Sequence, residues 1–214
     1  VSNTDENSFF HIEPFGFSAQ STNKKYLLPI YRDQDNQHIL GQLFIGFEGL
    51  EPDSHISILF QLAKGTSDPL TAFPDISWSF LNDANEWQWF ETEEIIYDST
   101  DALRGSGIIT FNIPKNASNI SDKFSDSFHW LRASITDNIE GVSDFVAITA
   151  QAIEVEFVNT KNSAEVLEQS FPSGTIKKLL NKDSNIKQIE QAFSSFGGVP
   201  EETDENYYVR VSER

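Results

Sequence analysis

The 214-residue sequence contains no cysteine and only four histidines. Without cysteine the chain can form neither a disulfide bond nor a thiolate metal site. The histidines occur singly, never at the i, i+4 spacing that places two metal ligands on one helix face, at His11, His38, His55 and His129. We therefore expect no metal site, and we interpret these histidines as surface or strand-edge residues.

Basic residues are also scarce, because 15 Lys and Arg face 33 Asp and Glu, for a formal net charge of −18. Nucleic acids and anionic membranes bind clustered Lys and Arg, so we expect neither as a partner. No apolar run approaches the ~20 residues that a membrane-spanning helix needs. The acidic charge is typical of a solvated surface, and it also suits a face that meets a basic neighbour in an assembly.

Patterns that carry catalysis are missing as well. Ser106 lies in GSG without the second spaced glycine of a nucleophile elbow, and no Gly-rich loop carries a phosphate-binding lysine. The sequence DQDNQH at 33–38 begins like a calcium loop, but Gln37 and His38 replace the acidic ligand and the glycine that such a loop requires. A hairpin tip explains it better, and abundant carboxylates alone do not indicate a hydrolase. We expect no enzyme and no cofactor.

Aromatic residues, by contrast, are abundant. They make up 13 % of the chain, with 18 Phe, and only 22 % of residues are charged, which argues against disorder and for a β-rich body. Short runs with apolar alternation or apolar character, bounded by turn residues, recur at 9–17, 26–31, 39–50, 56–65, 75–81, 86–91, 107–114, 128–135 and 145–158. The run at 145–158 is the most continuous, and it predicts a long central strand.

The two runs at 75–81 and 86–91 flank the turn sequence NDAN and predict a hairpin. The alternation places Trp87 and Trp89 on one face of it. The four tryptophans could line a sugar-binding groove, but core positions explain them better because their rings bury a large apolar area. We predict that four rings are mostly buried, namely Trp78, Phe80, Phe111 and Trp130.

Strands separated by turns, with no strong amphipathic helix before residue 200, predict a mainly β fold: a β-sandwich or jelly-roll-like body over 1–158. A smaller β connector is expected over 159–199. Within it, IKQIEQAF at 186–193 is ambiguous, because Ile186, Ile189 and Phe193 also fit helical spacing.

The last stretch, AFSSFGGVPEETDENYYVRVSER at 192–214, predicts a hinge at Gly197 and Gly198 and then the start of a helix over 200–214 that leads into a missing domain. Acidic residues crowd its first turn and Arg210 lies toward its other end, as the helix dipole favours. Tyr207 and Tyr208 lie on a face that needs a packing partner. The candidate interaction residues are Trp87, Trp89, Tyr207, Tyr208 and Arg210.

This terminal run resembles a signature of baseplate J-like proteins, the wedge components of contractile phage tails and phage-derived injection systems, except that Ala192 stands where that pattern has proline. LLPIY at 27–31 and QLFIGFEGLEPDSHISILFQLAKGTSDP at 42–69 are similar to baseplate proteins of the antifeeding-prophage type. The tryptophan hairpin at 78–87 and the W-L-R-A element at 130–133 continue the similarity, which covers most of 26–214.

The resemblance implies a non-catalytic structural segment of a baseplate wedge subunit. It implies assembly in the cytoplasm into a virion or tail-like particle, with other wedge proteins and hub or sheath components as partners. It also implies that these residues are an internal piece of a longer chain and are monomeric in isolation. For 186–193 the resemblance favours a strand over a helix. One alternative rests on the tryptophan hairpin: a carbohydrate-binding β-sandwich module on a tail or cell-surface protein.

Overall fold

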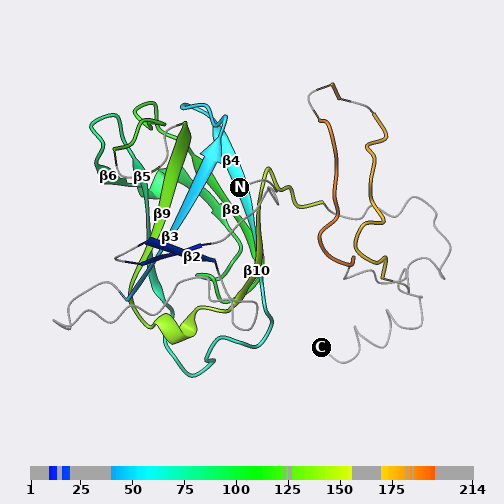
Figure 1. Cartoon of the computed structure of the whole chain (residues 1–214). Coiled ribbons are helices and arrows are strands. Elements are labelled where there is room, and N and C mark those ends of the chain that lie inside the picture. The colour runs from blue at the N-terminus through cyan, green and yellow to red at the C-terminus, as the bar shows by residue number, and fades with distance from the viewer. Residues whose placement is uncertain are drawn as a thin grey trace. The chain divides into compact units, whose positions relative to one another are not determined.

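The computed structural model (Figure 1) describes residues 10–13, 16–19, 40–155 except 123, 125 and 126, and 170–195 except 182 and 185. The chain divides into two compact units, Val1–Glu154 and Val155–Arg214, which we describe separately. Several predicted features lie outside the described residues: the strand at 26–31, the loop at 33–38, the hinge at Gly197 and Gly198, and the helix at 200–214.

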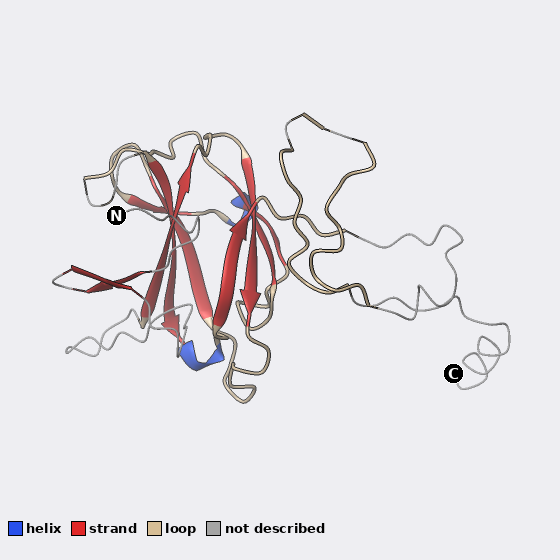
Figure 2. Ribbon diagram, turned by 45° about the vertical axis from the view of Figure 1, so that its right-hand side comes forward, coloured by secondary structure: helices blue, strands red, loops and turns tan. Residues whose placement is uncertain are grey.

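Two four-stranded sheets form the body of the first unit. One sheet has the order β3 (Gly41–Glu48), β9 (Phe128–Asp137), β5 (Asp75–Leu81) and β6 (Trp87–Trp89). The other has the order β10 (Phe145–Ala150), β4 (His55–Leu62), β8 (Gly107–Asn112) and β7 (Ile95–Asp98). All neighbouring strands are antiparallel, and the two sheets face each other as the layers of a sandwich (Figure 2). The predicted mainly β sandwich is confirmed.

The remaining described elements are short. β1 (Phe10–Glu13) and β2 (Gly16–Ala19) pair as an antiparallel hairpin where the sequence predicted a single edge strand or entry segment. Two 3-10 turns, η1 (Thr92–Glu94) and η2 (Ile139–Gly141), precede β7 and β10. The described residues contain no α-helix, and so no helix there could cross a membrane.

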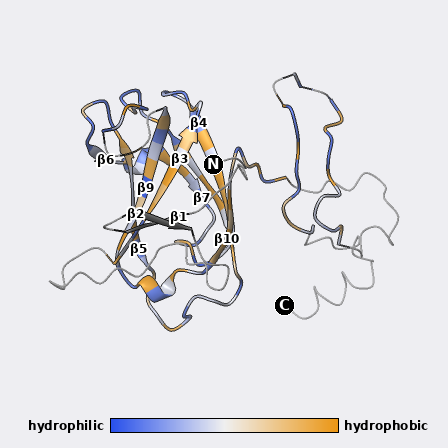
Figure 3. Cartoon of the chain, in the orientation of Figure 1, coloured by the Kyte–Doolittle hydropathy of each residue, from blue (hydrophilic) through white to orange (hydrophobic). Residues whose placement is uncertain are grey.

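Alternation of side chains explains why these segments form strands. In β4 the residues at every second position are buried, as predicted, at Ile56, Ile58, Phe60 and Leu62. Their neighbours in the strand point to the other face and are partly exposed. Figure 3 shows the same mixture of hydrophobic and hydrophilic residues along the strands of the body. Each sheet therefore has one face that must be covered by the other sheet.

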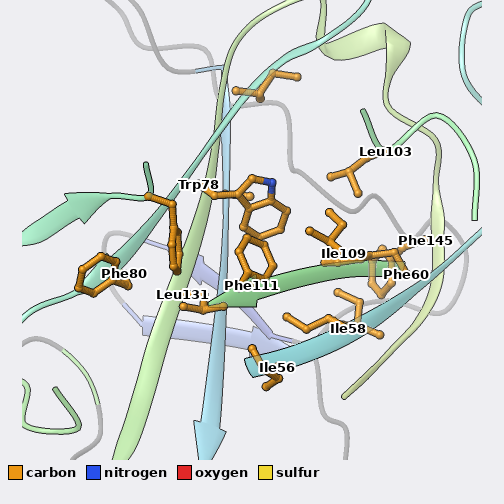
Figure 4. Close-up of a cluster of buried hydrophobic side chains, with 14 of the residues drawn as sticks. Ile56, Ile58, Phe60, Trp78, Phe80, Leu103, Ile109, Phe111, Leu131 and Phe145 are labelled. Carbon is orange, nitrogen blue, oxygen red and sulfur yellow. The ribbon is translucent and has the colours of Figure 1, made fainter. Parts of the chain in front are cut away.

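The core that joins the sheets is built around Trp78 of β5. Its ring centroid lies 5.7 Å from that of Phe60 and 5.0 Å from that of Phe111, and both of these phenylalanines come from the opposite sheet (Figure 4). Phe90 adds a further contact with Phe111 at 5.0 Å. Three of the four rings predicted to be buried are so: Trp78, Phe80 and Phe111.

The prediction of a long central strand at 145–158 is wrong. The described part of this run forms the six-residue strand β10, which lies at the edge of its sheet. Only Phe145 and Ile148 of this strand are buried, and Gln151 takes a positive φ of 59° that ends the extended backbone. An apolar run does not distinguish an edge strand from a central one, because the difference lies in which neighbours pair with it.

In the second unit the predicted strand at 186–193 is also wrong. These residues are described and are neither strand nor helix. The described part of this unit is held by backbone and side-chain hydrogen bonds between separate segments: the Ser195 amide donates to the Phe171 carbonyl at 2.8 Å, and the Phe171 amide donates to Ser195 Oγ at 2.7 Å. The spacing of Ile186, Ile189 and Phe193 is compatible with both a strand and a helix, so it could not predict that the segment forms neither.

We expect Phe111→Ala to lower the free energy of unfolding by about 3–5 kcal/mol, because its fully buried ring contacts both Trp78 and Phe90 and its removal leaves a cavity. Urea denaturation measures this. Phe73→Ala is the matched control: its ring is 59 % exposed and the loss should stay below about 1 kcal/mol. Equal losses in the two variants would contradict this description of the core.

His129 makes the folding stability of the body depend on pH. Its side chain is buried on the inner face of β9, its Nδ1 atom has no hydrogen-bond partner among the described residues, and this burial lowers its pKa below the ordinary value. The unfolded chain therefore binds a proton more readily than the folded one. The resulting loss of stability begins as the pH falls below about 6.5 and levels off below the folded-state pKa.

We expect His129→Leu to reduce the drop in unfolding free energy between pH 7.5 and pH 5.5, because the variant lacks the buried imidazole that the unfolded chain protonates more readily. Urea denaturation at the two pH values measures it. His55→Gln, which changes an exposed histidine on β4, serves as the control and should leave the drop unchanged. If both variants retain the full drop, the pH dependence comes from other groups.

Candidate interaction surface

Six aromatic rings gather on the outer face of the β3-β9-β5-β6 sheet, the side turned away from the core. We call this surface the aromatic face, and its members are Phe44, Trp87, Trp89, Phe124, Phe128 and Trp130. The outer face of a sandwich sheet is ordinarily polar because it meets water. A cluster of rings at such positions therefore calls for an explanation other than the core of this unit.

Strand register places these rings beside one another. Phe44 of β3 pairs with Arg132 of β9, Arg132 pairs with Ser79 of β5, and Ser79 pairs with Trp89 of β6. These four residues thus form one row across the whole sheet. Trp87 pairs with Leu81 two residues further along the ladder, so both tryptophans of the hairpin point outward, as the sequence predicted for a common face.

The rings of the aromatic face contact one another at tilted angles. Centroid distances are 5.6 Å for Phe44 and Trp87, 5.1 Å for Phe44 and Phe124, and 4.8 Å for Phe124 and Trp130, with interplanar angles of 50°, 42° and 33°. Trp87 and Phe124 meet edge to face at 76°. Such contacts hold the side chains in fixed orientations, and they leave the surface ridged instead of flat.

Arg132 lies among these rings. Its guanidinium carbon is 4.6 Å from the ring centroid of Trp87 and 5.0 Å from that of Trp89, and its Nε donates a 2.9 Å hydrogen bond to Ser79 Oγ. Burial lowers the pKa of Arg132, yet guanidinium keeps its charge in proteins. No carboxylate within the described residues forms an ion pair with it. The ring faces attract this charge, and no described residue other than Ser79 accepts a hydrogen bond from the guanidinium group.

Gly46 explains how Trp130 fits. It lies directly opposite Trp130 in the β3–β9 ladder, and a Cβ atom at Gly46 would come within 2.9 Å of the indole ring. The ring thus covers a glycine in the middle of a strand, a position where glycine is otherwise unfavourable. Sequence reasoning placed Trp130 in the core. That prediction is wrong, because β9 turns Trp130 outward and leaves it partly exposed.

The tryptophans accordingly have two roles. Trp78 is a core residue as predicted, whereas Trp87, Trp89 and Trp130 lie on the outer surface, with Trp89 50 % exposed. The core interpretation preferred for all four holds for Trp78 alone. The other candidate interaction residues, Tyr207, Tyr208 and Arg210, lie outside the described residues together with Gly197 and Gly198.

Sequence reasoning missed four residues of this surface: Phe44, Phe124, Phe128 and Arg132. A signal existed, because in 39–50 and 128–135 both alternating sets contain large apolar residues. One set is needed for the core, so the second set had to lie on an outer face. Phe124 carried no such signal, since it sits in a loop that only the tertiary structure brings over Trp87.

Acidic residues stand next to members of the aromatic face, one in the strand ladder and two in the sequence. Glu48 pairs with Phe128 at the end of β3, Glu86 precedes Trp87, and Asp122 lies two residues before Phe124. All three are exposed, and none forms an ion pair with another described residue. The surface therefore combines an apolar centre containing one arginine with an acidic margin.

The described part of the chain contains no group of three or more side chains that could hold a metal ion. His55 is exposed on β4, whereas His129 is buried on β9 of the other sheet. A hollow beside Trp89 is lined by Ser77, Thr92 and Ile95 and opens at the edge of β6. The aromatic face is thus the main candidate for recognition.

Replacing Gly46 by Ala should lower the free energy of unfolding by roughly 1 kcal/mol, since overpacking against the Trp130 ring outweighs the backbone gain of removing a glycine. Gly105→Ala is the control, because a Cβ there meets nothing nearer than 4.0 Å. Thermal or urea unfolding measures both. The cost should disappear in a Trp130→Leu background, and a cost that persists there would contradict the role assigned to this pair.

Comparison with known proteins identifies the family. No curated protein matches the chain. The family model described as "Baseplate protein PVC11-like" matches residues 2–214, which is nearly the whole sequence. A baseplate protein works by holding its neighbours, and a fixed cluster of outward aromatic side chains is consistent with that role. The chain therefore belongs to the PVC11-like family of baseplate proteins, components of phage-like contractile injection particles.

Proposed function

We propose that this chain is a non-catalytic segment of a wedge subunit, related to baseplate J-like proteins, in the baseplate of a contractile injection particle. The family match over 2–214 carries the proposal. The aromatic face supports it, because a structural subunit needs a rigid surface that holds a neighbour in register. The similarity of LLPIY, the tryptophan hairpin and the terminal run to baseplate J-like sequences supports the finer assignment.

The sandwich is suited to bearing load. Its two sheets are joined by buried rings, and β9 pairs along its length with both β3 and β5. A pull on the aromatic face is therefore distributed over three hydrogen-bonded strands. Trp and Arg side chains are enriched among residues that dominate binding energy, and Trp in particular buries a large area while losing little conformational freedom.

The proposed partners are other wedge proteins and hub or sheath components, with assembly in the bacterial cytoplasm before the particle is complete. In this proposal 1–158 form the sandwich body, 159–199 form a connector, and 200–214 begin a helix. Tyr207, Tyr208 and Arg210 then belong to a second contact region, with Gly197 and Gly198 as the hinge before it.

Carbohydrate binding is the second candidate, and one observation favours it: Trp89 is half exposed beside a hollow with hydroxyl groups from Ser77 and Thr92. Two observations weigh against it. Arg132 occupies a face of both hairpin tryptophans, and the neighbouring rings are tilted by 33° to 76°, whereas a sugar ring stacks on a flat and open aromatic face.

We expect the double variant Trp87→Ala and Trp89→Ala of the full-length protein to reduce the yield of intact sheathed particles about tenfold in cells that produce them, because central aromatic anchors dominate such contacts. Electron microscopy of negatively stained particles provides the count. The control is Ile96→Ala with Tyr97→Ala, which removes comparably exposed side chains from β7 of the other sheet. Normal yield with the tryptophan variant, or loss of binding to a glycan array with it, would contradict the proposal.

A further inference from the structure

We propose that the aromatic face is the seat of a neighbouring protein subunit whose contacting surface is basic: an apolar side chain set against Trp87, Trp89 and Phe128, and Lys or Arg residues facing Glu48 and Glu86. This inference rests on the proposed function and adds the chemistry of the partner. It concerns the described residues of the sandwich alone.

Charge is the first argument. Residues 40–155 contain 18 Asp and Glu against five Lys and Arg, a net charge of −13. The exposed carboxylates at the margin of the aromatic face have no ion-pair partner among the described residues. A second acidic surface brought against this margin would be repelled, whereas a basic one is drawn to it and fixed in register.

Ring geometry is the second argument. The rings of the aromatic face are tilted against one another, so they present both ring faces and ring edges to side chains of another protein, and aromatic groups favour such edge-to-face contacts. Arg132 lies between Trp87 and Trp89 with guanidinium N–H groups that no described residue accepts. A carbonyl or carboxylate oxygen of the partner can accept those hydrogen bonds. The partner surface that meets Arg132 should therefore be apolar except for one hydrogen-bond acceptor.

The combination defines the occupant. An apolar centre with one partly buried arginine and a charged margin is the usual anatomy of a protein–protein contact. Nucleic acid is repelled by the acidic margin. A glycan would leave the margin carboxylates without cationic partners, and it has no apolar side chain to pack against the tilted rings.

Zero-length carbodiimide cross-linking of assembled particles tests the inference, because it joins a carboxylate to a lysine only when the two are in contact. We expect cross-links from Glu48 or Glu86 to a lysine of another polypeptide, identified by mass spectrometry. We also expect hydroxyl-radical oxidation of Trp89 to fall at least about fivefold between the free chain and the particle, while Tyr97, 45 % exposed on β7, is the reference residue for the free surface.

Charge reversal gives the matched variants. Glu48→Lys with Glu86→Lys should lower incorporation of the protein into particles about tenfold through repulsion of the basic partner. Glu140→Lys with Glu154→Lys changes the net charge equally at exposed positions away from the aromatic face and should leave incorporation unchanged. Equal effects of the two variants would show that total charge matters and would overturn the inference.

The remaining outcomes separate the two proposals. Cross-links only to Lys24 or Lys25 of the same chain, or protection of Trp89 by a soluble oligosaccharide, overturn the basic protein partner. Full exposure of Trp89 in particles that contain the protein overturns it too, and leaves the baseplate role intact. Absence of the protein from assembled particles overturns the proposed function itself.

Discussion

The contact of Trp78 with Phe60 and Phe111 joins two sheets that would otherwise each expose an apolar face. Burial of these rings removes a large apolar area from water, and no disulfide or metal ligand from cysteine supplements it, since the chain has none. The orientation of β5 follows from this contact, because turning Trp78 inward fixes which residues of β5 face outward. Through its ladders with β6 and β9, the same choice fixes the outer face of the whole sheet.

The aromatic face is a consequence of that arrangement. Once alternate residues of β3 and β9 fill the core, Phe44, Phe128 and Trp130 have no place except outside. Gly46 then gives Trp130 room, and Arg132 fills the space between the hairpin tryptophans. The outer rings are thereby held by neighbours on several strands. A surface ordered before binding loses little conformational entropy when a partner arrives, which suits a subunit that must hold a neighbour in register.

The rigid rings and the acidic charge contribute to recognition at different distances. The binding energy of the tilted rings and Arg132 depends on close contact, whereas Glu48, Glu86 and the acidic body act over a longer range and orient an approaching subunit. Membership of a baseplate family is consistent with both, because such a particle must assemble in order and then stay together. His129 is buried on the inner face of the same sheet, and its lowered pKa makes the unfolding free energy of the body fall in acid.

The sequence alone determined the mainly β class, the inward set Ile56, Ile58, Phe60 and Leu62, and the tryptophan hairpin, because alternation and turn residues act over a few neighbouring positions. It did not determine that 145–158 forms an edge strand or that 186–193 forms none, since apolar composition does not specify pairing partners. Only the tertiary structure decided that Trp130 faces outward and that Phe124 lies over Trp87. Both depend on strand pairings and loop positions between residues far apart in the chain; local alternation shows that 128–135 has two apolar faces, but it does not specify which of them pairs into the core.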